Sequence, residues 1–212
     1  MLIHPWDEAS RAEWQAVLRH HDFGQLVTAG LVEGFPVVVP THFLYDDEAG
    51  EVLLHLARPN PAWQAIEADP HVVLAVHADW TYVEAAWNAN EGTDPEVGVP
   101  TSYYTAVQLR GRATVVDDPA EKATILARQL AHFEPVGSTR REPSPDEESD
   151  RRQLPGIRGL RISLTSVRAK QKYGGNKTPE HRERIAGRLA ERNGPGDEAA
   201  RGHLLRRNTL RP

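Results

Sequence analysis

The sequence of 212 residues contains no cysteine. Disulfides, thiolate catalysis, cysteine-ligated zinc and iron–sulfur clusters are therefore excluded. No apolar run approaches the length that spans a membrane, and the start MLIHPWDEAS has neither the basic region nor the apolar core of a signal peptide. These absences predict a soluble, cytoplasmic protein without a membrane partner.

The common nucleotide-binding and catalytic motifs are also missing. The sequence has no G-x-G-x-x-G, no Walker A, no G-x-S-x-G and no H-E-x-x-H. Its ten histidines are scattered, and none is matched by a carboxylate at a ligand spacing. We therefore assign no catalytic residue and no metal ligand from the sequence.

Charge is distributed unevenly along the chain, although the formal net charge is only −5. Residues 142–150 carry five acidic side chains and no basic one, whereas residues 151–177 carry eight Lys or Arg and no Asp or Glu. Such a basic block is either an ordinary solvated face or a surface that meets phosphate, on a nucleotide or on nucleic acid.

Short apolar and β-branched runs separated by turn residues predict a strand-rich α+β protein. The strands follow one another in meander order without βαβ spacing, which favours an antiparallel barrel with added helices over a Rossmann domain. Residues 88–102 and 135–156 are predicted connections, and the tail 193–212 is predicted to be partly helical or frayed. The predicted strands are 23–29, 36–47, 51–57, 71–78, 80–87, 103–118 and 156–173. The predicted helices begin near Ser10, Pro61, Asp118 and Thr178, and the last two are predicted to end at about Phe133 and Arg192.

Three stretches combine glycines, amides and cations at predicted strand ends. In HLARPNPAW, two prolines hold Asn60 in one backbone geometry beside Arg58. PTHF places polar groups on a neighbouring apolar strand, and AKQKYGGNK sets two glycines among amide and ammonium groups. Together they would suit a phosphate or another anion.

A series of motifs resembles a known family. In chain order they are FGQLVTA (23–29), PVVVPTH (36–42), Asn60-Pro61-x-Trp63, VPT (99–101) with a tyrosine after it, Ala106-Val107 before Gly111, GIRGLRIS and Lys172-x-x-x-Asn176-Lys177. Their order and spacing resemble the PaiB-like family of FMN-binding split-barrel proteins, described as negative transcriptional regulators. The resemblance covers roughly residues 1–192.

The resemblance implies a six-stranded antiparallel split barrel with flanking helices over 1–177, followed by a helix and an arginine-rich tail over 178–212. It implies a homodimer with FMN at the subunit interface and, as a regulator, DNA contacts through 151–177 and the tail. The implied cofactor-binding residues are Thr41, His42, Phe43, His55, Arg58, Asn60, Lys172, Asn176 and Lys177.

Two further functions stay open. The same pocket would serve a flavin-dependent oxidoreductase, for which His42, His55 and Tyr104 are the candidate proton donors. Alternatively, the barrel has lost its cofactor and serves as an interaction module. Departures from the family pattern motivate this last hypothesis. Ser102 and Tyr103 follow the VPT motif where tryptophan and asparagine are usual, Thr81, Tyr82 and Glu84 stand where histidine, tyrosine and serine are frequent, and Gly174-Gly175 stands where Ser-Gln is usual.

Overall fold

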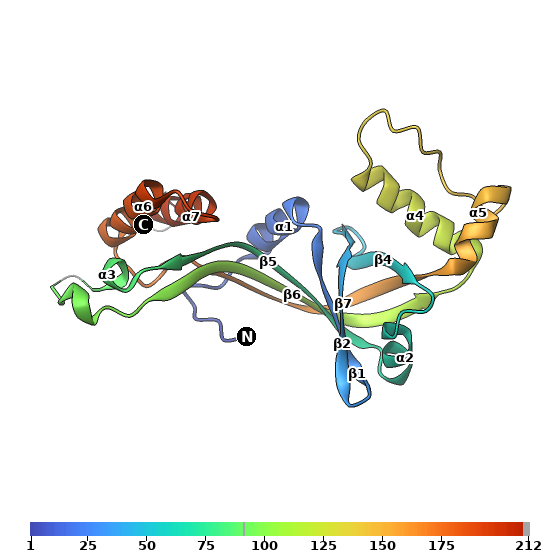
Figure 1. Cartoon of the computed structure of the whole chain (residues 1–212), viewed down its shortest axis with the longest axis horizontal. Coiled ribbons are helices and arrows are strands. Elements are labelled where there is room, and N and C mark those ends of the chain that lie inside the picture. Colours follow the sequence, from blue (N-terminus) through green and yellow to red (C-terminus); the bar gives the residue numbers. More distant parts are fainter. Residues whose placement is uncertain (91, 210–212) are drawn as a thin grey trace. The chain divides into compact units, whose positions relative to one another are not determined.

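A computed structural model describes residues 1–90 and 92–209, with the side chains of 208 and 209 left aside, so the end of the predicted tail lies outside the described residues. Figure 1 shows a sheet with helices attached to it. The strands are β1 (Phe23–Val32), β2 (Phe35–His42), β3 (Leu44–Asp46), β4 (Glu51–Ala57), β5 (His71–Val83), β6 (Thr101–Val116) and β7 (Ile157–Lys172). The helices are α1 (Arg11–His20), α2 (Ala62–Ala68), α3 (Ala85–Asn88), α4 (Pro119–Phe133), α5 (Glu148–Gln153), α6 (Pro179–Arg192) and α7 (Asp197–Thr209).

One sheet contains all seven strands, in the order β2-β1-β5-β6-β7-β4-β3. Strands β1 and β2 form an antiparallel hairpin whose register runs from the pair Phe23 and His42 to the pair Val32 and Phe35. Its turn, Glu33-Gly34, has positive φ at both residues, which suits the twist of a tight hairpin. β4 pairs antiparallel with β7 along its whole length. The predicted α+β class with an antiparallel sheet and flanking helices is confirmed.

The number of strands differs from the six that the resemblance implies. Residues 36–47 were predicted as one strand, but they divide into β2 and β3 at Phe43. The Phe43 side chain is fully buried, and its backbone N–H donates to the Asp22 carbonyl at 2.9 Å. This backbone contact takes Phe43 out of the ladder, so two strands replace one.

The predicted separate strand over 80–87 is wrong. Strand β5 continues without interruption to Val83, passing Asp79 in a left-handed conformation with φ 52°. Residues 85–88 then form the short helix α3. Tertiary packing carries the strand through a residue whose backbone geometry is unusual for a non-glycine.

Two helix starts follow the predicted chemistry. The Asp118 side chain accepts hydrogen bonds from the N–H groups of Ala120 and Glu121, with Pro119 in the first turn of α4. The Thr178 hydroxyl accepts from His181 N–H at the start of α6. Both helices also end where the sequence predicts, at Phe133 and Arg192.

The chain forms two compact units. Unit 1 comprises 1–14, 77–107 and 169–212, and unit 2 comprises 15–76 and 108–168. Strands β5, β6 and β7 each contribute residues to both units. The boundary between 177 and 178 that the sequence suggests stays a prediction.

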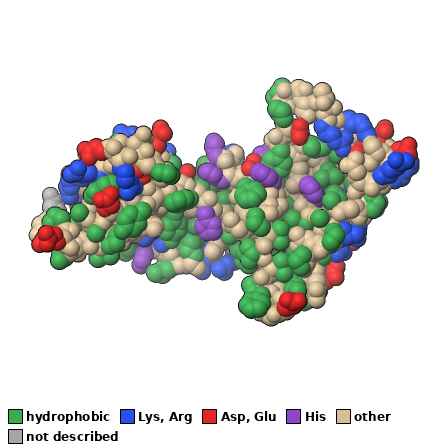
Figure 2. All heavy atoms as spheres, viewed as in Figure 1, with side chains coloured by type: hydrophobic (Ala, Val, Ile, Leu, Met, Phe, Trp, Pro, Cys, Tyr) green, Lys and Arg blue, Asp and Glu red, His purple; other side chains and the backbone are tan. Residues whose placement is uncertain are grey.

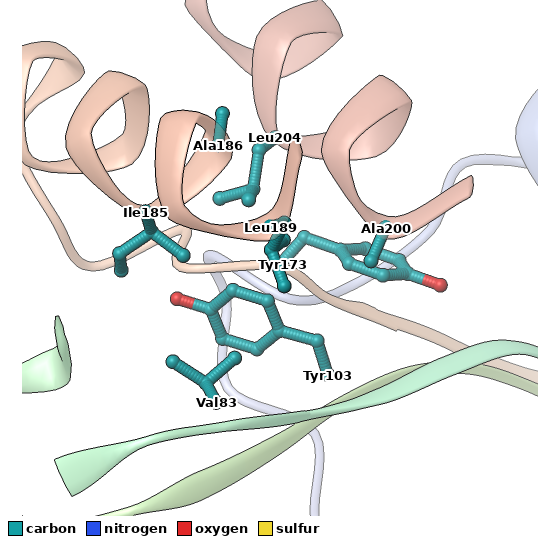
Figure 3. Close-up of a cluster of buried hydrophobic side chains, with 8 residues drawn as sticks. All are labelled: Val83, Tyr103, Tyr173, Ile185, Ala186, Leu189, Ala200 and Leu204. Atoms are coloured by element: carbon teal, nitrogen blue, oxygen red, sulfur yellow. The ribbon is translucent and has the colours of Figure 1, made fainter. Parts of the chain in front are cut away.

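Unit 1 has its own apolar core (Figure 3). Strand residues and residues of α6 and α7 meet in it, so the tail helix is a packed element rather than a frayed one. The rings of Tyr103 and Tyr173 pack in a T-shaped arrangement at a centroid distance of 5.9 Å. The core residues are Val83, Tyr103, Tyr173, Ile185, Ala186, Leu189, Ala200 and Leu204.

Unit 2 is built on close contact between its helices and strands. Ile125 of α4 packs with Leu53 of β4 and Val116 of β6. Helix α2 lies so close to β1 that a Cβ at Gly30 would be 1.9 Å from the Ala65 carbonyl oxygen. Only glycine permits this approach, and the corner between β4 and α2 is thereby fixed on the sheet.

Two absences hold for the described residues. None of their helices has the length and apolar character to cross a membrane. No three His, Asp or Glu side chains among them gather as metal ligands would.

Candidate functional site

The corner between β4 and α2 is held by Asn60 and Trp63. The Asn60 carbonyl oxygen Oδ1 accepts from Ala62 N–H at 2.9 Å, and its backbone N–H donates to the Ala57 carbonyl at 3.0 Å. The indole N–H of Trp63, which is almost fully buried, also donates to Ala57 at 2.9 Å. The amide nitrogen of Asn60 has no partner within the described chain. It is the donor at this corner that remains available to a ligand.

The Arg58 side chain already has hydrogen-bond and ion-pair partners within the chain. Its Nε donates to the Pro155 carbonyl at 2.7 Å, and its guanidinium pairs with Asp117 at 2.9 Å. Asp117 also receives Arg158 at 2.7 Å, and Arg158 reaches Glu67 at 2.7 Å. Hydrogen bonds from Arg158, and then from Arg58, lower the pKa of the Asp117 carboxyl. The charge of Arg58 is therefore largely compensated within the chain.

Of the three predicted contact residues in the PTHF stretch, His42 is the one whose side chain is exposed. The Thr41 hydroxyl donates to the His42 carbonyl at 2.9 Å, and Phe43 is fully buried. The His42 side chain is 62% exposed, with Nδ1 3.6 Å from an oxygen of Asp22. Its ring meets the edges of Phe23 and Phe133 at centroid distances of 4.9 and 5.2 Å. His42 thus offers an imidazole among aromatic rings.

His55 lies on the exposed side of β4. Its Nδ1 is 2.7 Å from Oε1 of Gln129, a buried residue of α4. Because an amide oxygen only accepts, Nδ1 carries the proton in this pair, and Nε2 remains for another partner.

The three predicted residues of the C-terminal segment belong to unit 1. Lys172 Nζ donates to the Thr101 hydroxyl at 2.6 Å, and within the described residues no carboxylate pairs with it. Lys177 Nζ donates to the Asn88 carbonyl at 2.9 Å and to Oδ1 of Asn90 at 2.7 Å. Both ammonium groups are bound only by neutral oxygens. Asn176 is exposed.

Burial affects both of these lysines. It lowers the pKa of Lys172, and the neighbouring Lys170 lowers it further, while Asp7 acts in the opposite direction. Burial also lowers the pKa of Lys177. Lys170 itself lies 3.6 Å from Asp7, and the Tyr104 ring lies below both Lys170 and Lys172 at 5.7 and 6.0 Å. An anion at Lys172 would offset a positive potential that Asp7 compensates only in part.

The two glycines of the segment serve packing. Gly174 has φ 61°, and a Cβ there would lie 2.8 Å from the Tyr103 hydroxyl. A Cβ at Gly175 would be 2.2 Å from the Trp6 carbonyl and 2.9 Å from the Arg207 guanidinium. The glycine pair therefore admits the N-terminal segment and α7 against this turn.

The structure thus divides the nine predicted residues. Six lie in unit 2 and three in unit 1. Sequence reasoning missed the partners Asp117, Gln129 and Thr101, which lie far along the chain from Arg58, His55 and Lys172. The acidic Asp117-Asp118 pair at a helix start gave a signal for a cap, which Asp118 is, but none for an arginine partner.

A protein-family model covers residues 1–166, that is, most of the chain. It is the model described as "Putative FMN-binding domain". The chain belongs to this FMN-binding family. Lys172, Asn176 and Lys177 lie beyond the matched residues. No curated protein matches the chain.

Family membership supports FMN as the cofactor, and the donors described above fit its chemistry. An FMN phosphate requires cations and N–H donors. In unit 2 the Asn60 amide is such a donor, and in unit 1, separately, Lys172 and Lys177 are such cations; among the described residues no carboxylate pairs with any of the three. Arg58 fits less well, because Asp117 already occupies it.

Three solved structures resemble this member of the FMN-binding family in fold. The FAD and heme binding protein of Mycobacterium smegmatis is 18% identical, with a TM-score of 0.59 over 78% of this chain and 72% of its own. The flavocytochrome Anf3 of Azotobacter vinelandii is 19% identical, with a TM-score of 0.58 over 81% and 75%. A conserved hypothetical protein of Mycobacterium tuberculosis is 17% identical, with a TM-score of 0.55 over 81% and 90%. At these identities the likeness concerns the fold alone.

Proposed function

We propose that this chain is a homodimeric FMN-binding protein of the PaiB-like type that acts as a flavin sensor or transcriptional regulator. The observation that carries the flavin part is the family match over residues 1–166. The motifs of the PaiB-like family, read in order along the sequence, motivate the narrower assignment.

In this proposal the contacts to the cofactor phosphate remain those that the resemblance implies. They are His55 and Asn60 in unit 2 and, as a separate set, Lys172, Asn176 and Lys177 in unit 1. Thr41 and Phe43 contribute through their backbone, since the hydroxyl of Thr41 is engaged and Phe43 is buried. His42 and its aromatic neighbours Phe23 and Phe133 line the isoalloxazine ring of the flavin. When bound, FMN supplies the electron chemistry, and the residues of the chain orient it.

Exposed apolar side chains on the β1–β2 hairpin support the homodimer. Phe35 is 73% exposed, and Phe23, Leu31 and Val38 are each about half exposed. Hydrophobic side chains are visible at the surface around this hairpin (Figure 2). Strand β2 is an edge strand of the sheet. Several large, exposed apolar side chains along one hairpin are typical of a protein interface.

The basic block offers less to DNA than its composition suggests. Arg152, Arg158, Arg161 and Lys170 each pair with a carboxylate. A regulator built on this chain would therefore contact DNA through few free cations. We expect any such binding to be weak and to fall steeply with salt.

The test is a titration of the purified full-length chain with FMN, followed by flavin fluorescence, together with light scattering for the mass in solution. We expect saturable binding of one FMN per chain and a dimer mass. An absence of FMN binding would refute the flavin function, and a monomer would refute the homodimer. A mobility-shift experiment at low salt, repeated at higher salt, addresses DNA separately.

A second function, flavin-dependent oxidation or reduction of a small molecule, is favoured by His42. Its exposed imidazole lies near the Asp22 carboxylate and among aromatic rings, a placement suited to proton transfer. Turnover of NADH or NADPH by the FMN-loaded protein, lost in His42→Gln with FMN binding retained, would establish this function over the sensor.

A further inference from the structure

A cavity of about 370 Å³ opens within unit 2, on residues of β1, β5, β6 and β7. None of the nine predicted flavin contacts lines it. Its lining contains no Asp or Glu, and it combines valines and alanine with one arginine, one histidine and hydroxyl groups. The lining residues are Val27, Thr28, Ala29, His71, Val72, Val73, Arg110, Gly111, Thr165 and Ser166.

Arg110 is the distinctive residue of this cavity. Its Nε is buried and has no hydrogen-bond partner, and no ion pair to Arg110 is present in the described chain. A buried guanidinium N–H without an acceptor destabilises a protein, and such groups are rare. The other arginines of unit 2 discussed above, Arg58 and Arg158, both bind carboxylates. Arg110 thus lines the cavity without an anionic partner in the described chain.

The surroundings of Arg110 hold it in place. A Cβ at Gly111 would be 2.5 Å from the Ser163 carbonyl, so β6 and β7 approach closely here. The Thr165 hydroxyl donates to the Arg110 carbonyl at 3.2 Å. This contact and the close strand approach set the backbone of Arg110 beside Thr165.

Two further groups complete a site for an anion. The Ser166 hydroxyl has no partner among the described residues and is a donor in the same cavity lining as Arg110. His71 Nδ1 is 2.7 Å from Oδ1 of Asp69, which leaves Nε2 of its ring for another partner. Asp69 does not line the cavity, so its carboxylate does not compete directly for Arg110.

We propose that this cavity binds a small molecule that carries an oxyanion group, either carboxylate or phosphate, on a small apolar body. Arg110 and Ser166 bind the oxyanion, and Val27, Ala29 and Val73 contact the apolar part. The volume lies at the lower end of the range for small-molecule sites, which limits the ligand to a compact one. The site is separate from the proposed flavin contacts and does not depend on them.

The test is calorimetric titration of the full-length chain with phenyl phosphate and with benzoate. We expect saturable binding of at least one probe, weakened tenfold or more in Arg110→Gln and unchanged in Arg112→Gln. Arg112 is a matched control because it lies two residues along the same strand, is exposed and does not line the cavity. The tighter probe identifies the oxyanion as phosphate or carboxylate.

A second variant, Ser166→Ala, guards against a folding defect in Arg110→Gln, and we expect it to weaken the same probe severalfold. Failure of both probes to bind the wild-type chain would overturn the proposal, as would equal affinity in wild type and Arg110→Gln. FMN titration of Arg110→Gln separates the two sites. Unchanged FMN affinity supports a distinct site, whereas its loss would place Arg110 in the flavin site and overturn the inference.

Discussion

Arg58 in unit 2 and Lys172 in unit 1 are both candidates for contact with a flavin phosphate, yet their surroundings differ. The Arg58 guanidinium is held by the Asp117 carboxylate and by a backbone carbonyl. Within the described residues, the Lys172 ammonium donates its hydrogen bond to the Thr101 hydroxyl and pairs with no carboxylate. A cation paired with a carboxylate mainly fixes structure, whereas one paired with neutral oxygens retains most of its field for a ligand. The sequence does not distinguish the two.

Arg192 is a cation that, like Arg58, pairs with a carboxylate, and its partner Asp197 is buried. The Asp197 carboxylate is buried and receives Arg192 at 2.6 Å, the Thr81 hydroxyl at 2.5 Å and Gly194 N–H at 2.8 Å. We expect Asp197→Asn to lower the free energy of unfolding at neutral pH by about 3 kcal/mol, because it leaves Arg192 without its main partner. Urea unfolding measures this, with exposed Glu191→Gln as the control.

This effect has a definite pH dependence. Hydrogen bonds from Arg192, then from Thr81 and Gly194, lower the pKa of Asp197 from 3.8 to about 2. A carboxyl with a lowered pKa stabilises the fold above its ordinary pKa and loses that contribution as the pH falls through the lowered value. The difference between wild type and Asp197→Asn should therefore shrink between about pH 4 and pH 2. A constant difference over this window would contradict the assignment.

The variant Lys172→Gln tests the role of a cation that pairs with no carboxylate in the described residues. It preserves a donor for Thr101 and removes the charge. We expect FMN affinity to fall by about 1.5–3 kcal/mol, the value of a charge-assisted hydrogen bond, with little change in melting temperature. Fluorescence titration with FMN measures the loss. Arg58→Gln is the matched comparison and should lose less, because Asp117 already neutralises that side chain. A larger loss in Arg58→Gln would reverse the comparison.

The smallest expected effect separates two roles of Asn60. Asn60→Asp retains the oxygen that accepts from Ala62 N–H but removes the amide donors, whereas Asn60→Ala removes both. We expect Asn60→Asp to keep the wild-type stability and to weaken FMN by about 1 kcal/mol. Asn60→Ala should also lose about 1 kcal/mol of stability, as for other helix-start residues. Equal FMN affinity in wild type and Asn60→Asp would limit Asn60 to the corner.

Local chemistry explains which elements the sequence predicts well. Strand β4 and helices α4 and α6 have the predicted bounds at one or both ends, because their caps, prolines and alternation act within a few residues. The break at Phe43 and the uninterrupted path of β5 through Asp79 depend on partners elsewhere in the fold. The tail 193–212, which contains Gly194-Pro195-Gly196, was predicted to be partly helical or frayed, and α7 packs in the core of unit 1. No local pattern contains that contact.

The candidate site shows the same limit. Sequence motifs identify Asn60 and Lys172 as candidate contacts. What each can offer a ligand depends on which of its donor and acceptor atoms already have partners within the chain. Asp117 lies 59 positions from Arg58 in the sequence, and Thr101 lies 71 from Lys172. Compensation of charge over such separations cannot be read from spacing. The nine flavin contacts therefore stay predictions, ranked by how much of each donor is free.

The path of the chain has a consequence for how this protein can be divided. The chain passes between the units four times, at 14–15, 76–77, 107–108 and 168–169, and each passage falls inside a helix or strand. No linker is therefore available at which either unit could be excised, exchanged by recombination or expressed alone. The two units are expected to have been inherited together, and chimeras with relatives should be joined at loops such as 134–147 rather than at the unit boundaries.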